Sequence, residues 1–235
     1  MPAESKTAKR ERASRINNTL AQTYPDAHCA LNFRNPFELL TATILSAQCT
    51  DERVNMVTPV LFKRFPDART MAEASLPELE ELIRTTGFFR NKAKSLKGMA
   101  QALVRDFKGK VPRTMEELRP LPGVGRKTAN VVLGNCFDVP GLTVDTHMSR
   151  VNQRLGLTRN SDPEKIERDL MDLIPQPEWT LYSHRIITHG RQICIARRPR
   201  CEVCPVSSDC EYFRKVFSAQ KRASAKKIPR LPRKP

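Results

Sequence analysis

Four short segments of the sequence carry the same signal for the start of an α-helix. Each places a side chain that can cap a helix three residues before a glutamate, as in Asn35–Glu38, Ser75–Glu78, Thr114–Glu117 and Ser161–Glu164. The capping oxygen accepts a hydrogen bond from a free N–H of the first turn, and the glutamate favours the positive helix end. Pro36, Pro77 and Pro163 fall inside first turns, where no N–H is missed.

Apolar residues at helical spacing follow these starts, as in the series that begins at Leu39 and the one that begins at Ile166. We expect four glycines to mark helix ends: Gly87, Gly109, Gly156 and Gly190. No run of alternating apolar and polar residues competes with the helical pattern. The sequence therefore predicts an all-α body of roughly ten helices joined by short connections.

The positive charge of the chain is concentrated at its two ends. The 235 residues carry a formal net charge of +16, of which residues 16–213 contribute only +4. Residues 1–15 contribute +3, and residues 214–235 hold nine basic side chains and no acidic one. We expect flexible basic tails at 1–14 and 214–235 and a polyanionic partner. Nucleic acid is favoured over anionic lipid because no Trp- or Phe-rich amphipathic face accompanies the charge.

The sequence contains no signal for a membrane or for export. No apolar run approaches the ~18 residues that a membrane span needs. The N-terminus lacks the apolar region of a secretory signal, and Glu4 and Glu11 weaken an interpretation as a transit peptide. We expect a protein without a membrane partner that acts as a monomer in the cytoplasm, in a bacterium at the nucleoid.

The seven cysteines form two groups. Cys29, Cys49 and Cys136 stand among apolar residues and are expected to be small buried side chains. The other four are spaced C-x6-C-x2-C-x5-C at Cys194, Cys201, Cys204 and Cys210. An odd total without an export signal argues against a disulfide framework. Four thiols in one short segment indicate a metal centre, and the spacing alone allows either Zn²⁺ or an iron–sulfur cluster.

The segment LPGVGRKTA at residues 121–129 lies between two predicted helices. Gly123 and Gly125 flank Val124 and allow a tight turn that presents backbone N–H groups at the start of the second helix. Such a turn can bind a phosphate through its amides and the helix dipole. Lys127 follows Arg126 at that helix start. It is either a phosphate contact or a nucleophile, because a positive helix end and partial burial both disfavour the ammonium form.

Asp145 follows the apolar stretch Leu142–Val144 and is predicted to cap a helix that ends at Gly156. As a cap alone it would contribute about 1 kcal/mol. The amides that it accepts would also hold the carboxylate ionised and fixed in direction. A residue that stabilises positive charge developing on a sugar needs both properties.

Together these motifs resemble the endonuclease III family of DNA glycosylases. The resemblance rests on LPGVGRKTA, on the aspartate of VDTH 18 residues after Lys127, and on the four-cysteine spacing, in that order along the chain. It covers about residues 15–213. The implied fold has two α-helical domains: a six-helix barrel at 29–139 with the helix-hairpin-helix element, and an iron–sulfur domain formed by 15–28 and 140–213.

The resemblance also implies an activity. Lys127 matches the family's nucleophile, which attacks C1′ of a damaged nucleotide in duplex DNA as the base leaves and forms a Schiff base. β-Elimination then cuts the abasic strand. Asp145 matches the catalytic aspartate that stabilises the oxocarbenium-like charge. The implied substrates are oxidised pyrimidines and abasic sites in double-stranded DNA.

Two further segments match the residues that fill the gap left by a flipped base. Gln48 matches the glutamine that faces the orphaned base, and Phe88 stands at the inserted position of the wedge loop. The family often has leucine there, so Phe88 is a departure. An aromatic wedge can stack on the neighbouring base, and we expect it to affect the preference for the opposite base.

The family spacing assigns a [4Fe–4S] cluster to Cys194, Cys201, Cys204 and Cys210. Three arginines lie between the first two cysteines: Arg197, Arg198 and Arg200. Pro199 stiffens this segment, which we expect to contact DNA phosphates, although surface charge alone would also explain it.

Two alternatives to the bifunctional glycosylase and lyase remain open at this point. A monofunctional mismatch glycosylase of the same family would use water as the nucleophile, and Lys127 argues against it. A non-catalytic DNA-binding or redox protein would need only the hairpin and the cluster. The pair Lys127 and Asp145 argues against that interpretation.

Overall fold

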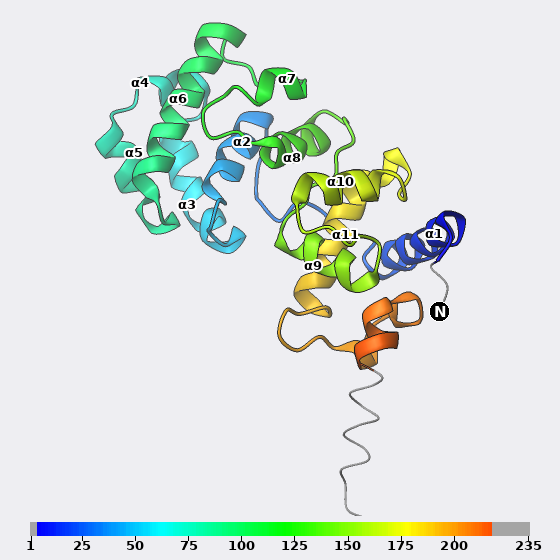
Figure 1. Cartoon of the computed structure of the whole chain (residues 1–235). Coiled ribbons are helices and arrows are strands. Elements are labelled where there is room, and N and C mark those ends of the chain that lie inside the picture. Colours follow the sequence, from blue (N-terminus) through cyan, green and yellow to red (C-terminus); the bar gives the residue numbers. More distant parts are fainter. Residues whose placement is uncertain (1–3, 218–235) are drawn as a thin grey trace, which may run out of the picture. The chain divides into compact units, whose positions relative to one another are not determined.

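The computed structural model describes residues 4–217, and these residues form eleven α-helices, several short helical turns and no strand (Figure 1). The all-α prediction is therefore confirmed for this part of the chain. None of its helices is long and apolar enough to cross a membrane.

The chain divides into two compact units. Cys29–Gly141 forms one of them, which we call the continuous unit. The other, which we call the discontinuous unit, combines the residues up to His28 with those from Leu142 onward.

The continuous unit contains seven helices around one apolar core. They are α2 (Pro36–Leu45), α3 (Asp51–Arg64), α4 (Ala68–Glu73), α5 (Leu76–Ile83), α6 (Phe89–Phe107), α7 (Met115–Leu118) and α8 (Arg126–Cys136). The central element is α6, which packs against α4, α5 and α2, while α2 also packs against α8 and α3. Leu39, Leu96 and Leu103 are completely buried in this core. The helices α2 and α6 thus form the scaffold on which the loops of the unit are mounted.

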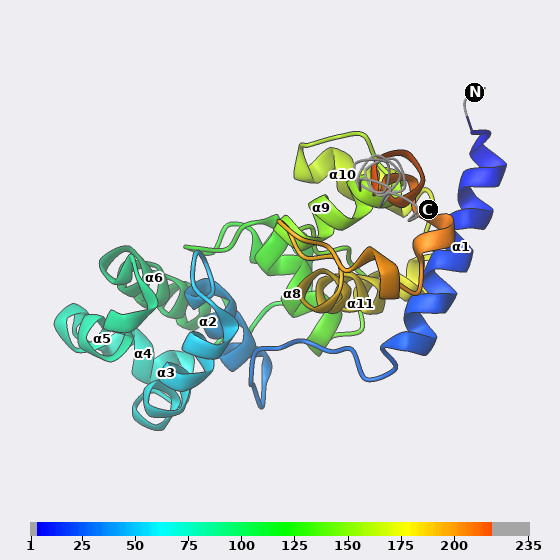
Figure 2. The same cartoon turned by 90° about the horizontal axis from the view of Figure 1, so that it is seen from below.

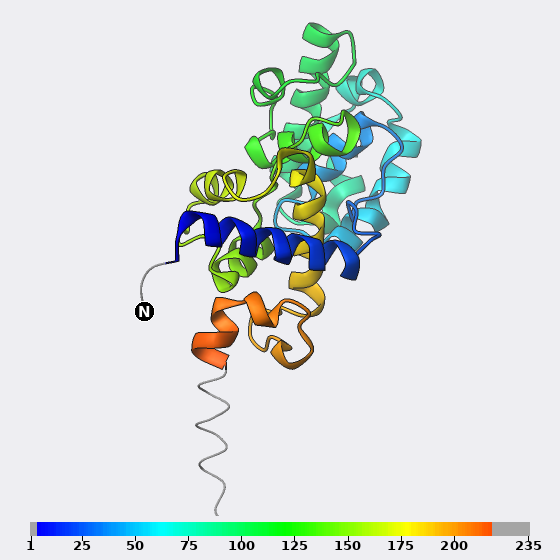
Figure 3. The same cartoon turned by 90° about the vertical axis from the view of Figure 1, so that its right-hand side faces the viewer.

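The discontinuous unit brings the N-terminal helix against the C-terminal part of the chain. Its helices are α1 (Lys6–Thr23), α9 (Thr146–Leu155), α10 (Pro163–Met171) and α11 (Trp179–Gln192). Figure 3 shows α1 crossing α11, and these two helices are in contact. The cysteine segment after α11 contains two short 3₁₀ turns, Cys201–Val203 and Ser207–Asp209, and folds back beside α1 (Figure 2). Phe213–Phe217 follows as a π-helical turn.

Three of the four predicted helix starts are confirmed. The side chains of Asn35, Ser75 and Thr114 each accept a hydrogen bond from the backbone N–H three residues on. At the fourth start the cap is Asp162, not Ser161, and its carboxylate accepts from the N–H of Lys165 at 2.9 Å. An aspartate adjacent to Ser161 supplies the same kind of acceptor, so the boundary moves by one residue.

The glycines predicted to end helices have different roles. Gly156 ends α9 in the left-handed conformation, at φ 76°, as expected. Gly190 lies inside α11, so this prediction is wrong. A Cβ atom at Gly190 would lie 3.0 Å from the His147 Nδ1 atom and 3.2 Å from an Arg150 nitrogen. Glycine is present there because α9 side chains approach the backbone of α11 closely, which the local sequence does not reveal.

The N-terminal segment differs from the expected flexible tail at 1–14. The helix α1 begins at Lys6 and is capped by Ser5, whose side chain accepts from the N–H of Ala8 at 3.1 Å. The basic side chain of Arg12 is buried rather than solvated. It donates to backbone carbonyls far away in the sequence, which orders this segment. The basic tail expected at 214–235 begins within the π-helical turn, and its residues from 218 onward lie outside the described part of the chain.

Candidate functional site

The glycine turn between α7 and α8 has the geometry of an anion-binding loop. Gly123 has φ 78°, in the left-handed region that favours glycine, and Val124 next to it is buried. Gly125 is the N-cap of α8, and no side chain caps that helix. The first N–H groups of α8 and its positive dipole end therefore meet the surface at an exposed glycine, as a phosphate-binding turn requires.

This turn rests on the two scaffold helices of the continuous unit. A Cβ atom at Gly123 would lie 2.8 Å from the Ser95 Cβ of α6 and 3.4 Å from the Ile44 Cγ2 of α2. A Cβ atom at Gly98 of α6 would come within 3.1 Å of Pro122. Glycine at position 123 is thus required by its backbone angle and also by the close approach of α6. The hairpin turn is held in a fixed place on α2 and α6.

Lys127 is the second residue of α8, directly after Arg126. The residue is exposed, in contrast to the partial burial expected from the sequence. It lies in the first turn of α8, which is at the surface. The amine thus stands on a rigid helix one residue beyond a half-buried arginine and next to the anion-binding turn.

Asp145 of the discontinuous unit caps α9, as predicted. Its Oδ1 atom accepts a hydrogen bond of 2.7 Å from the backbone N–H of Met148. Its backbone carbonyl accepts from the hydroxyl of Ser149 at 2.9 Å. The carboxylate is half-buried and fixed in direction by the helix that it caps. Near it, the Nδ1 atom of His147 accepts from the guanidinium of Arg150 at 3.1 Å, and burial is the main cause that lowers the pKa of His147.

Gln48 and Phe88 share an unusual backbone conformation. Their φ angles are 52° and 47°, and both side chains are exposed, Phe88 by 64%. A bulky aromatic residue in the left-handed region is rare and strained, and such strain persists only where the surroundings impose it. Gly87 before it also has a positive φ, of 71°. Both residues predicted to fill the gap in DNA are therefore held out from the continuous unit by strained turns.

A buried lysine connects these two turns. The Lys92 Nζ atom donates to the carbonyls of Leu45 and Thr86, both at 2.7 Å. Lys92 is not among the residues that the sequence motifs single out. The available signal was its position in α6, four residues before Leu96 on the buried stripe of the helix.

The four cysteines after α11 line one cavity of about 350 Å³ that includes its open mouth. Cys201 and Cys210 are buried, while Cys194 and Cys204 are half-buried. Burial, together with the neighbouring cysteines, raises the pKa of the Cys201 and Cys204 thiols to about 11. Within residues 4–217, no three His, Cys, Asp or Glu side chains gather around a point that would hold a single ion. All four cysteines nevertheless line the same cavity, together with Arg154 and His189.

Polar groups beside this cavity are suited to support thiolate ligands. The Arg154 guanidinium donates to the Cys194 sulfur at 3.3 Å. The His189 Nε2 atom lies 3.6 Å from the Cys204 sulfur. A cluster held by four thiolates depends on such hydrogen bonds to its sulfur atoms. The residues present therefore fit a [4Fe–4S] group.

His189 is held in place by a second partner. Its Nδ1 atom lies 3.0 Å from the hydroxyl of Tyr24, in the loop that follows α1. Burial lowers the pKa of His189 to about 4 and raises that of Tyr24 to about 12. With the Tyr24 hydroxyl donating to Nδ1, the neutral imidazole carries its one proton on Nε2, which faces the Cys204 sulfur.

The arginine-rich segment after Cys194 is ordered through its backbone. The carbonyls of Cys194, Ile195 and Ala196 accept hydrogen bonds from Arg154, and the N–H of Arg200 closes the loop on Ile193 at 2.9 Å. The three arginines expected to contact phosphate have exposed side chains: Arg197, Arg198 and Arg200. A rigid loop thus presents three cations to solvent next to the first cysteine.

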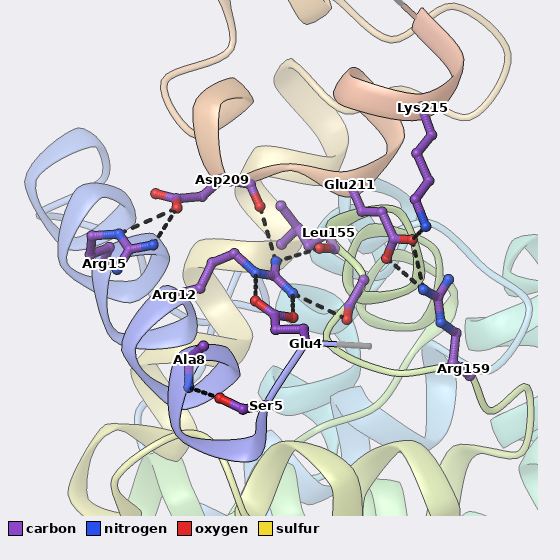
Figure 4. A network of polar contacts seen from close by, with 11 residues as sticks. Glu4, Ser5, Ala8, Arg12, Arg15, Leu155, Arg159, Asp209, Glu211 and Lys215 are labelled. Atoms are coloured by element: carbon purple, nitrogen blue, oxygen red, sulfur yellow. Dashed lines mark hydrogen bonds and ion pairs between the residues drawn. The ribbon is translucent and has the colours of Figure 1, made fainter. Parts of the chain in front are cut away.

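A polar network joins α1, the end of α9 and the cysteine segment (Figure 4). The Arg12 guanidinium donates to both carboxylate oxygens of Glu4 at 2.8 Å, to the Leu155 carbonyl at 2.7 Å and to the Asp209 carbonyl at 3.0 Å. Arg15 binds the carboxylate of Asp209 at 2.8 Å. Arg12 therefore connects the N-terminal helix to the C-terminal end of α9 and to the residue before Cys210.

Two family models match the chain. The model described as "HhH-GPD superfamily base excision DNA repair protein" matches residues 41–176. The model described as "Iron-sulfur binding domain of endonuclease III" matches residues 194–210, a span that begins and ends at a cysteine of the cluster segment.

The curated relatives are similar over almost their full length. Endonuclease III of Synechocystis sp. is 56% identical over 204 residues, which cover 86% of this chain and 93% of the relative. Endonuclease III of Bacillus subtilis is 44% identical over 81% of this chain and 88% of its own. Endonuclease III of Escherichia coli is 39% identical over 86% of this chain and 95% of its own.

Solved structures agree with these relatives. A trapped covalent intermediate of an endonuclease III with DNA, in an estranged-adenine complex, has a TM-score of 0.85 at 44% identity and covers 88% of this chain and 98% of that one. A non-covalent endonuclease III–DNA complex has the same TM-score at 43% identity, with 89% and 98% covered. A thermostable thymine-DNA glycosylase, 23% identical with a TM-score of 0.81, shares the fold over 88% of this chain and 99% of its own.

Proposed function

This chain belongs to the HhH-GPD base excision repair proteins and, among them, to the endonuclease III family, whose members are bifunctional DNA glycosylases and AP lyases, and we propose that it excises oxidised pyrimidines with Lys127 as its nucleophile. The substrates are duplex DNA that carries such a base and duplex DNA that carries an abasic site. The family membership argues against a non-catalytic DNA-binding or redox role as the main function, and Lys127 argues against a monofunctional mismatch glycosylase.

The Lys127 amine forms the covalent bond to DNA. Its free electron pair attacks C1′ of the damaged nucleotide, the glycosidic C–N bond breaks, and the base leaves with the bonding electrons and takes up a proton. Opening of the sugar gives a protonated Schiff base between Nζ and C1′. Loss of a C2′ proton then expels the 3′ phosphate and cuts the strand, and hydrolysis of the imine regenerates the amine.

Asp145 is an electrostatic partner for this chemistry. Positive charge develops on the sugar ring as the base departs, and a fixed carboxylate stabilises it without reorganisation. The cap bond to Met148 keeps the Asp145 oxygen in one orientation while the second oxygen remains available.

The exposed cations and the glycine turn hold the DNA backbone. The amides around Gly123, Val124 and Gly125, at the start of α8, bind phosphate without reading sequence. Arg126 adds a charge at the same helix end, and the loop of Arg197, Arg198 and Arg200 adds three more. Gln48 and Phe88 enter the space that the flipped base leaves.

Cys194, Cys201, Cys204 and Cys210 would hold the [4Fe–4S] cluster. When bound, this group links four thiolates that are separated in the sequence and so closes the segment that follows α11. Arg154 and His189 donate to two of the ligand sulfurs. The arginine loop begins at Cys194, the first ligand. A cluster that fixes Cys194 would therefore also fix the position of the proposed phosphate contacts.

The observation that carries this proposal is the place of Lys127. An exposed amine stands on the first turn of an uncapped helix, directly beside an anion-binding glycine turn, in a chain of the endonuclease III family. A phosphate bound at the turn would bring the adjoining sugar within reach of that amine.

The test is borohydride trapping with duplex DNA that carries an oxidised pyrimidine, such as thymine glycol. Borohydride reduces a Schiff base to a stable amine, so the native protein should form a covalent complex with the DNA. Lys127→Ala should abolish the complex and keep duplex binding. Lys63→Ala removes an equal charge from the exposed end of α3 and should trap like the native protein.

Two results would contradict the proposal in different ways. Base release without any trapping by the native protein would mean that water is the nucleophile, as in a monofunctional glycosylase. Trapping by Lys127→Ala would mean that another amine attacks C1′. A panel of oxidised, reduced and fragmented pyrimidines, each opposite each normal base, would then define the lesion preference.

We also propose that the protein acts as a monomer on the bacterial chromosome. The curated relatives reported above are bacterial. Sedimentation of the native protein with and without a short lesion duplex should give one protein per duplex. A dimer at the concentration of the trapping assay would contradict this.

A further inference from the structure

Lys92 is a buried lysine in the continuous unit that is held by backbone carbonyls. It lies in the first turn of α6 and is only 5% exposed. Its Nζ atom donates to the Leu45 carbonyl and to the Thr86 carbonyl, each at 2.7 Å. Lysine is rarely buried because taking an ammonium group out of water is unfavourable unless it gains good partners. Such a residue in the core needs an explanation beyond packing.

The two carbonyls belong to different turns. Leu45 is the last residue of α2 and precedes Gln48 by three positions. Thr86 ends the 3₁₀ turn Arg84–Thr86 and precedes Phe88 by two positions. A single amine therefore bridges two segments that are 41 residues apart in the sequence and that each lead into a strained residue.

The end of α2 and burial act on the charge of this amine in opposite directions. The Leu45 carbonyl is at the negative C-terminal end of α2, where a positive charge is stabilised by the helix dipole. Burial lowers the pKa of Lys92, and the neighbouring Cys49 opposes that shift. Cys49 follows Gln48 directly, so the surroundings of the amine include the turn that it supports.

We propose that Lys92 is a positioning residue that holds the Gln48 turn and the Phe88 turn at a fixed spacing, so that both side chains enter the same gap in DNA. This inference rests on the proposed function, in which Gln48 and Phe88 fill the space of the flipped base. Lys92 itself touches neither DNA nor the reacting sugar. It acts through the backbone of two turns.

The physical reason is the strain at both tips. A non-glycine residue at φ near 50° returns to a relaxed conformation unless its neighbours prevent it. The two hydrogen bonds from Lys92 fix the residues just before each tip, and the core beneath α2 and α6 fixes the lysine. Without the amine, two buried carbonyls lose their donor and the two turns are free to move independently.

The first test measures insertion without any chemistry. The probe is a duplex with a tetrahydrofuran abasic analogue and 2-aminopurine opposite the gap, whose fluorescence reports on stacking there. Lys92→Met keeps the length of the side chain and removes the donor. We expect it to lose most of the fluorescence change and about tenfold in affinity for this duplex, with unchanged affinity for undamaged duplex. Lys63→Met, the charge-matched control, should behave like the native protein.

The second test separates base excision from strand cleavage. Excision of an oxidised pyrimidine requires flipping and gap filling, whereas a preformed abasic site is already open. Lys92→Met should lower single-turnover excision by at least about tenfold and lower borohydride trapping at a preformed abasic site by less than about threefold. Lys92→Arg, which keeps a donor in reach of both carbonyls, should recover part of the excision rate.

The possible outcomes are distinct. A folded Lys92→Met that inserts normally, or that loses excision and abasic-site trapping by the same factor, would overturn the inference. Unfolding of both Lys92→Met and Lys92→Arg would also overturn it, because a structural role would then explain the residue. If the native protein showed no trapping on any substrate, the proposed function would fail, while the insertion test with the abasic analogue would still decide the role of Lys92.

Discussion

The two units of the molecule are stabilised by different kinds of interior. The continuous unit has one large apolar core, and Lys92 and Glu38 are the charged side chains that it buries within residues 29–141. The discontinuous unit has a smaller apolar core. It buries the charged side chains of Arg12, Glu167 and Arg185 and the imidazole of His189. Among the described residues, each unit also buries five uncharged polar side chains: Thr41, Thr43, Thr58, Thr86 and Asn130 in the continuous unit, and Asn17, Thr143, Asn152, Thr158 and Ser183 in the discontinuous unit.

This difference corresponds to what each unit must hold. The continuous unit carries the glycine turn, Lys127 and the two strained tips, all mounted on α2 and α6, and a dense apolar core keeps such loops at fixed positions. The discontinuous unit joins distant segments of the chain around a cofactor site, and its buried hydrogen bonds specify one arrangement of those segments. Both units are packed around an apolar core, and the discontinuous unit adds more buried charged contacts and the cluster to a smaller core.

Loss of a cluster ligand should have the largest effect and should be confined to one unit. Binding of a structural metal group contributes folding free energy, so Cys201→Ser should destabilise the discontinuous unit by more than about 5 kcal/mol. Cys136→Ser, a change at a half-buried cysteine of the continuous unit, should cost about 1–3 kcal/mol. Iron content and hydrogen exchange resolved by unit would test this. Equal loss of protection in both units after Cys201→Ser would contradict the comparison.

The next largest effect is expected for Asp145→Asn, which keeps the helix cap and removes the negative charge. Asparagine caps a helix as well as aspartate does, so Asp145→Asn should leave the free energy of unfolding within about 0.5 kcal/mol. The excision rate should still fall by about 10²–10³-fold, or about 3–4 kcal/mol in activation free energy, because the fixed negative charge is lost. Single-turnover kinetics and thermal unfolding measure the two effects. An active Asp145→Asn enzyme would mean that the residue is only a cap.

Among the polar residues through which α1 contacts the rest of its unit, Arg12 should cost the most unfolding free energy when it is replaced. Arg12→Met leaves the carbonyls of Leu155 and Asp209 without their donor and should cost about 3 kcal/mol. Denaturant unfolding of the holoprotein measures this free energy. The matched control is Arg15→Met in the same helix, whose exposed ion pair with Asp209 should matter much less. Similar losses in the two variants would show that the buried network does not specify the docking of α1.

The smallest expected effect is a loss of folding stability at low pH. Hydrogen bonds from Arg159, followed by those from Lys215, lower the pKa of Glu211 from 4.5 to about 2. The folded state thus holds this proton less tightly than the unfolded state does, so the stabilisation is complete above about pH 4.5 and disappears as the pH falls toward 2. Because both partners are exposed and screened, we expect only about 1 kcal/mol.

Glu211→Gln is the variant that checks this acid effect. It should reduce stability at pH 7 and leave it almost unchanged near pH 2, as measured by denaturant unfolding at several pH values and low salt. A constant difference between the native protein and Glu211→Gln across this pH range would contradict the assignment.

Much of the local structure could be predicted because its causes lie within one helical turn. Asn35, Ser75, Thr114 and Asp145 each bind an N–H three residues away, so the pattern and its cause are both present in a short window. The cysteine spacing is local in the same sense. The predictions for Ser161 and Gly190 were wrong for opposite reasons. The neighbouring Asp162 caps α10 in place of Ser161, which is a local effect. Gly190 is required by the close approach of α9, a helix distant in the sequence.

The sequence by itself determined the helices and their caps, the glycine turn with Lys127 behind it, the cysteine segment and, through these motifs, the family. Only the tertiary structure decided that Gln48 and Phe88 sit on strained turns joined by Lys92, that His189 lies between Tyr24 and Cys204, and that Arg12 is buried. The Arg12 bonds to Leu155 and Asp209 connect residues 143 and 197 positions apart. Capping and periodicity depend on neighbours along the chain, whereas the partner of a buried charge depends on which segments the whole core brings together.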